Sequence, residues 1–161
     1  MLTGAHPALR KTGLMHHNTQ PTITLPALSD KALEAFSNII VTATEGGEYT
    51  LSDYRKWTNY KHGETNNGFR AEVTVYPTKN AYSDSELLAD TEGNLLKPVC
   101  LTPEVLAGRL FPKLIDPKTT AHHRVMIARL LAGDEDIAGE MDVIDAGAIL
   151  QIAVYGDVIF G

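Results

Sequence analysis

The stretch GFRAEVTVY, residues 68–76, decides the class of fold. Apolar and polar residues alternate along it, and a period of two predicts a strand with one buried face. Asn-Asn-Gly at 66–68 comes just before the apolar positions and is typical of a tight turn between two strands. Pro77 ends the pattern, because proline has no backbone N–H to give to a sheet. The apolar positions are Phe69, Ala71, Val73 and Val75.

Two helices are predicted downstream of this strand. Thr102 followed by Pro103 is a typical helix start, with a capping hydroxyl and a proline at the first helical position. Thr119 or Thr120 caps the strongest helical pattern, and Gly133 is its expected end. The apolar face of that helix consists of Val125, Ile127, Ala128, Leu130 and Leu131.

Upstream, a helix is predicted to begin at Ser29 or Asp30 and to run to about Asn38. The β-branched residues of 22–25 and 39–44 predict a short strand on each side of this helix. The order of elements therefore alternates helices with strands, which favours one sheet with helices packed on it.

Two further strands are expected nearer the C-terminus. Residues 95–101 predict a strand at the edge of the sheet, because Pro98 cannot donate to a neighbour. Residues 149–160 are apolar and rich in β-branched side chains, with a possible turn at Gly156 and Asp157. This segment belongs either to the domain's own sheet or to a partner's sheet, to which it adds a strand.

The fold class predicted is α/β: a single domain with a mixed, several-stranded sheet and packed helices. The chain has 161 residues and a net charge of −6, which suits one globular domain and excludes a wholly basic coat for duplex nucleic acid. Residues 1–20 carry +2 and are expected to form a flexible arm, and residues 21–132 form the α/β core. Residues 133–161 are an acidic segment that ends in the apolar strand.

No motif predicts an enzyme, a metal site or a bound cofactor. The adjacent histidines His16-His17 and His122-His123 lack ligand spacing, because neighbours on a helix point in different directions. Cys100 lies in an apolar stretch and is expected to be an inert buried thiol. The acidic residues 134–136 are expected to form a solvated turn, and no apolar run reaches the length of a membrane helix.

Residues 49–82 carry the clearest binding pattern. They hold seven of the eleven aromatic residues, interleaved with bases, as in proteins that bind single-stranded nucleic acid. A Thr50 cap and apolar residues three apart also predict a short helix here, and the same rings then serve core packing or a protein interface. The candidate contact residues are Tyr54, Arg55, Lys56, Trp57, Lys61 and Arg70.

In size and organisation the chain resembles the minor assembly and packaging factor of the cystoviruses, the enveloped double-stranded RNA phages. The features that carry the resemblance are the arm Met1–Gln20, the body Pro21–Ala132 and the charged end Gly133–Gly161. The resemblance implies a non-enzymatic, homodimeric protein that assists shell assembly and RNA packaging beside the viral capsid protein and polymerase. It also implies a place in the virion interior, or in the host cytoplasm during assembly. Single-stranded nucleic-acid binding through residues 49–82 is the alternative.

Overall fold

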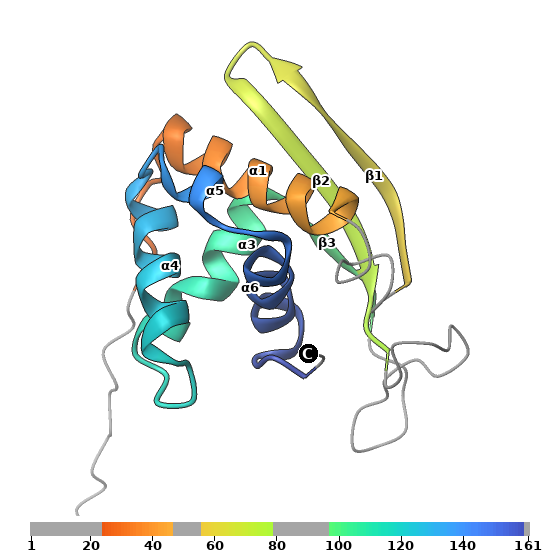
Figure 1. Ribbon diagram of the computed structural model, residues 1–161. Helices are drawn as coiled ribbons and strands as arrows, with labels where there is room; N and C mark the ends of the chain where they lie inside the picture. Colours follow the sequence, from red (N-terminus) through yellow and green to blue (C-terminus); the bar gives the residue numbers. More distant parts are fainter. Residues whose placement is uncertain (1–23, 47–55, 79–96, 160–161) are drawn as a thin grey trace, which may run out of the picture.

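The computed structural model describes residues 24–46, 56–78 and 97–159, which form a single domain of helices packed on a sheet (Figure 1). The strands are β1 (Lys56–Thr65), β2 (Gly68–Tyr76) and β3 (Val99–Leu101). The helices are α1 (Asp30–Glu45), α3 (Pro103–Leu110), α4 (Ala121–Ala132), α5 (Ile137–Glu140) and α6 (Val143–Tyr155), with a 3₁₀ turn η1 (Phe111–Leu114). The predicted arm, residues 1–20, lies outside the described residues.

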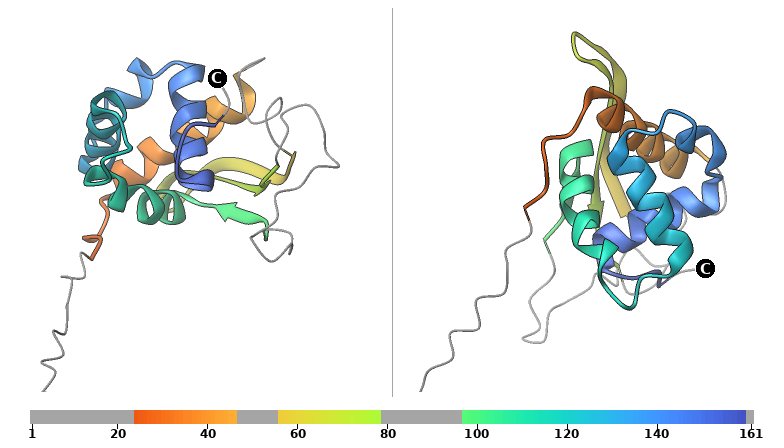
Figure 2. Two further views of the ribbon diagram at one scale, coloured as in Figure 1. Left: turned by 90° about the horizontal axis from the view of Figure 1, so that it is seen from below. Right: turned by 90° about the vertical axis from the view of Figure 1, so that its left-hand side faces the viewer.

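The sheet has the order β1-β2-β3, and both pairs are antiparallel where the sequence predicted a mixed sheet. The tight turn before Gly68 imposes this geometry on β1 and β2, because only antiparallel neighbours can be joined by a short hairpin. Ala71, Val73 and Val75 are buried and their neighbours are not, which confirms the predicted half-buried strand. The described helices cover the face that carries these side chains (Figure 2).

Helix α1 begins where the sequence predicted and ends later. The Ser29 hydroxyl accepts a hydrogen bond from the Ala32 N–H at 3.1 Å, so the cap is confirmed. The strand predicted over 39–44 is wrong, because these residues continue α1 and bury Ile39, Ile40 and Ala43 on the same side as Phe36. Burial along a helical stripe has overridden the β preference of the branched side chains.

Two other local predictions fail in the residues that the structure describes. Of the strand expected over 22–25, Thr24 and Leu25 are not in a strand, and residues 22–23 lie outside the described part of the chain. The short helix expected after Thr50 is not formed in its described part, because Trp57 and Tyr60 belong to β1. Residues 47–55 lie outside the described part of the chain. The turn at 66–68 pairs β1 with β2 and so fixes it as a strand.

The capping signals around α3 and α4 are confirmed. The Thr102 hydroxyl accepts from the Val105 N–H, Pro103 is the first helical residue, and the Thr120 hydroxyl accepts from the His123 N–H. Gly133 ends α4 in the left-handed region, with φ 69°. Of the edge strand predicted over 95–101, Val99–Leu101 form β3 at the edge of the described sheet. Residues 97–98 are not in a strand, and residues 95–96 lie outside the described part of the chain.

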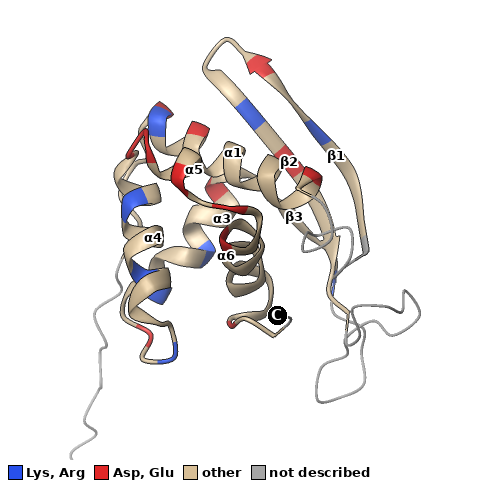
Figure 3. Cartoon of the chain, in the orientation of Figure 1, with Lys and Arg blue, Asp and Glu red and all other residues tan. Residues whose placement is uncertain are grey.

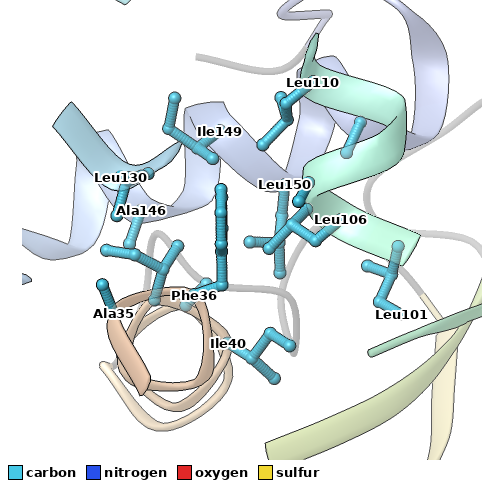
Figure 4. Packing of buried hydrophobic residues seen from close by; sticks show 14 of the residues in the cluster. Ala35, Phe36, Ile40, Leu101, Leu106, Leu110, Leu130, Ala146, Ile149 and Leu150 are labelled. Carbon is cyan, nitrogen blue, oxygen red and sulfur yellow. The ribbon is translucent and has the colours of Figure 1, made fainter. Parts of the chain in front are cut away.

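The apolar strand predicted over 149–160 is wrong, because most of this segment is the C-terminal part of α6. The Asp142 side chain caps the helix by accepting from two backbone N–H groups, and Gly156 ends it with φ 83°. Ile149 and Leu150 are fully buried against α1 and α3 (Figure 4), so the segment belongs to the domain core and not to a partner. A helix buried on nearly all sides has the same apolar composition as a buried strand.

The core joins all the major elements. Helix α1 packs against β2 on one side and against α6 on the other (Figure 1), and α3 also contacts the sheet through β2 and β3. No described helix is long and apolar enough to cross a membrane. The largest fully buried side chains are Phe36, Ile39, Ile40, Leu101, Leu106, Leu110, Ile127, Leu130, Ile149, Leu150 and Val73.

Candidate functional site

The candidate site is the hairpin formed by β1, β2 and the turn at Asn66 and Asn67. The hairpin turn extends beyond the helices (Figures 1 and 2). Strand β3 pairs only with Val73–Val75, so the part of β2 nearer the turn has no strand on that side within the described residues. The outer edge of β1 likewise has no neighbouring strand in the described part of the chain. The hairpin therefore has two stretches of strand edge with no neighbouring strand among the described residues, and we call these its open edges.

A β-bulge shapes β1 at the middle of the hairpin. Asn59 and Tyr60 together lie opposite Val73, because the register passes from Thr58 paired with Thr74 directly to Lys61 paired with Glu72. Asn59 has φ 53°, a left-handed conformation that asparagine tolerates better than most residues. Bulges commonly re-aim a side chain.

The Tyr60 side chain is anchored to the end of α1. Its hydroxyl donates to Glu45 Oε1 at 2.7 Å, and His62 Nε2 lies 3.2 Å from the same oxygen. Partial burial and the neighbouring Glu45 carboxylate together raise the pKa of Tyr60, so the phenol stays protonated at neutral pH. One carboxylate thus holds two residues of β1 against α1.

The aromatic residues of the hairpin form a row of ring contacts. Ring centroids are separated by 5.8 Å between Trp57 and Tyr60, 5.5 Å between Tyr60 and His62, and 5.7 Å between His62 and Phe69. Trp57, Tyr60 and Phe69 are half-buried and pack against the core. The rings therefore serve mainly to pack the hairpin on the domain, which leaves less ring face for stacking on bases.

Two bases of the hairpin, Lys61 and Arg70, are partnered by carboxylates. Lys61 Nζ lies 3.0 Å from Glu72 Oε1, on the strand position directly opposite. Arg70 Nη2 lies 3.1 Å from Asp30 Oδ1 at the start of α1, and the Arg70 side chain is only 19% exposed. The positive charge expected to track a phosphate backbone is therefore neutralised at both residues.

The structure places four of the six predicted contact residues on the hairpin. Trp57 and Arg70 are half-buried, Lys61 is exposed, and Lys56 begins β1. Tyr54 and Arg55 lie outside the described residues. The sequence did not point to Glu45 or Asp30, although both stand at ends of α1, where the helix crosses the hairpin.

A cavity of about 470 Å³ opens beside the hairpin, and we call it the hairpin cavity. It is lined by residues 61–65 of β1, residues 70–72 of β2 and residues 102–104 at the start of α3. Its position follows from the short length of β3: after Leu101 the chain turns into α3 and leaves this part of β2 uncovered by a strand. Its volume lies within the range of ligand pockets.

Among the described residues, His62, His122, His123 and Cys100 form no recognisable catalytic group. His122 Nε2 lies 3.1 Å from Asp145 Oδ1, and burial, followed by the neighbouring His122, lowers the pKa of His123. Across residues 24–46, 56–78 and 97–159, no three His, Cys, Asp or Glu side chains are placed to hold a metal ion. Cys100 is exposed rather than buried as predicted, because the alternation along β3 turns Leu101 to the core instead.

The acidic turn after α4 has a structural role. Arg129 is bonded to Asp134 through Nε at 2.6 Å and to both carboxylate oxygens of Glu140. Arg129 holds the pKa of both carboxyls below their ordinary values. Lys31 of α1 forms an ion pair with Glu135. Figure 3 shows acidic and basic residues close together where α1, α4 and α5 meet.

Comparison of the chain with protein-family models, with curated proteins and with solved structures finds no match in any of the three. Function therefore has to be inferred from the hairpin and its surroundings.

Proposed function

We propose that this chain is a non-enzymatic assembly factor that acts by binding other proteins through the hairpin. The observation that carries the proposal is the open strand edge: β3 reaches only Val73–Val75 of β2, and no described strand pairs with the outer edge of β1. Proteins usually cover or blunt such edges, because unpaired N–H and C=O groups attract further strands. A partner that adds a strand satisfies these groups.

The charge arrangement favours a protein partner over single-stranded nucleic acid. Lys61 and Arg70 each contact a carboxylate, and the aromatic rings pack toward α1. Nucleic-acid binding depends on free cations along the phosphate backbone and on free ring faces. The hairpin therefore suits main-chain pairing with a protein better than contact with RNA.

The proposed partners are the capsid protein and polymerase of a double-stranded RNA virus, inside the core particle or in the host cytoplasm during assembly. This part of the proposal is supported by the resemblance in size and organisation to the cystovirus packaging factors. The chain is proposed to act there as a homodimer in shell assembly and RNA packaging.

The test is to mix the full chain with purified capsid protein and polymerase of a cystovirus and to measure co-sedimentation. We expect the complex to persist as salt rises from roughly 50 to 200 mM, whereas binding to a labelled oligouridylate would weaken steeply over that range. Hydrogen exchange locates the contact: amides of residues 56–72 gain protection in the complex, and those of α4 serve as the internal control. Salt-sensitive RNA binding without any protein complex, or protection away from the hairpin, contradicts the proposal.

A further inference from the structure

We infer that the hairpin cavity is a binding site for an extended, basic peptide segment of a partner protein. This inference rests on the proposed function and adds the chemistry of the segment that is bound. Three observations carry it: the open edge of β2, the volume of the cavity and its unbalanced charge.

The open edge of β2 gives the shape of the occupant. Residues 70–72 line the cavity, and β3 does not pair with them, because it ends opposite Val73. A peptide in the extended conformation is able to pair with this backbone and continue the line of β3 toward the hairpin turn. A cavity of about 470 Å³ has room for several side chains of such a peptide.

The charges around the cavity give the chemistry of the occupant. Both cations of the lining are already paired, Lys61 with Glu72 and Arg70 with Asp30. Two lining carboxylates, Glu64 and Glu104, form no ion pair within the described residues. Glu104 Oε2 accepts a hydrogen bond from the Thr102 hydroxyl at 2.9 Å.

The unbalanced charge of the cavity is therefore negative. A phosphate-bearing ligand would meet two unpaired carboxylates, and like charges at short range oppose binding. A lysine or arginine side chain would instead gain a charge-assisted hydrogen bond to either carboxylate. A basic peptide is therefore expected to bind at this site in preference to RNA.

The test is a fluorescence-anisotropy titration of the full chain with two labelled eight-residue peptides. One alternates valine or threonine with lysine or arginine, and its counterpart carries glutamate or aspartate at the charged positions. We expect the basic peptide to bind at least tenfold more tightly than the acidic one. The double variant Glu64→Gln/Glu104→Gln is expected to lose at least fivefold in affinity for the basic peptide.

The matched control is Asp136→Asn/Asp157→Asn, which removes the same amount of charge at exposed carboxylates outside the cavity. It is expected to change the affinity less than twofold, and thermal melting checks that both double variants fold. Equal loss in the two double variants reduces the effect to net charge and overturns the inference. The inference is also overturned if both peptides bind equally, if neither peptide binds, or if oligouridylate displaces the basic peptide.

Hydrogen exchange provides an independent location. Binding of the basic peptide is expected to protect the amides of residues 70–72, and protection confined to other residues contradicts strand addition at this edge. Because the titration contains no capsid protein or polymerase, its failure removes the cavity as a peptide site and leaves the proposed function standing. Conversely, peptide binding without a capsid or polymerase complex overturns only the proposed partners.

Discussion

The substitution Ile149→Ala tests whether α6 is a core helix. Ile149 is fully buried between α1 and the neighbouring helices, whereas Ile144 on the same helix is 59% exposed. Ile144→Ala is therefore a matched control, with the same change of side chain and of helix propensity at a solvated position.

The expected loss follows from the atoms removed. Alanine lacks three carbons of isoleucine, and at about 0.8 kcal/mol for each buried carbon the transfer contribution is about 2.4 kcal/mol. The remaining cavity adds to this, and the better helix propensity of alanine subtracts a few tenths, so Ile149→Ala should cost about 2.5–4 kcal/mol. Ile144→Ala should stay within about 0.5 kcal/mol of the native protein.

The assay is urea unfolding followed by far-UV circular dichroism and by the fluorescence of Trp57, the single tryptophan. With a slope of about 2 kcal/mol per molar urea, the midpoint for Ile149→Ala should fall by roughly 1.2–2 M. Equal midpoints for the two variants, or a loss below about 0.5 kcal/mol for Ile149→Ala, would refute the placement of α6 in the core.

Two further predictions concern the ends of α4 and its neighbour. Gly133→Ala should destabilise the protein by about 1–2 kcal/mol in a thermal melt, because alanine is strained in a left-handed cap, while Gly139→Ala should not destabilise it. Arg129→Gln should lower the melting temperature most near neutral pH. Arg129 lowers the folded-state pKa of Asp134 and Glu140, so its stabilisation is present above their ordinary values of 3.8 and 4.5 and is lost as pH falls below them. A difference between native and variant that stays constant from pH 7 to pH 2 would contradict this linkage.

Local chemistry was enough to place the ends of several helices. Ser29, Thr102, Thr120 and Gly133 cap helices as predicted, because a cap depends on one side chain or one backbone conformation and on its nearest neighbours. The strand 68–76 was equally accessible, since a strand with one face in the core must alternate.

Long-range packing decided the elements that the sequence predicted wrongly. Residues 39–44 and 149–155 are rich in β-branched side chains, yet both are helical. The helices that contain them, α1 and α6, pack against each other, and no local pattern reveals this contact. Gly156 was interpreted as part of a hairpin turn, although glycine after a helix with an Asp142 cap is an equally good C-cap.

The candidate site was predictable in its position but not in its partners. The aromatic and basic residues of 49–82 predicted a binding region in this part of the chain, and Trp57, Lys61 and Arg70 do lie on the hairpin. Glu72, which pairs with Lys61, lies on the hairpin itself, but Asp30 and Glu45 belong to α1. Only the packing of α1 across β2 brings these two carboxylates to the hairpin.

The contact between α1 and α6 also has a consequence for how the chain folds during synthesis. The hairpin joins strands that are neighbours in the sequence, whereas α1 and α6 are far apart in it, so their contact forms only after both helices are made. Before that, α1 is able to pack against β2, α3, α4 and α5, but its surface that contacts α6 lacks the cover of that helix. A nascent chain without α6 exposes this apolar surface, and exposed apolar surface favours aggregation.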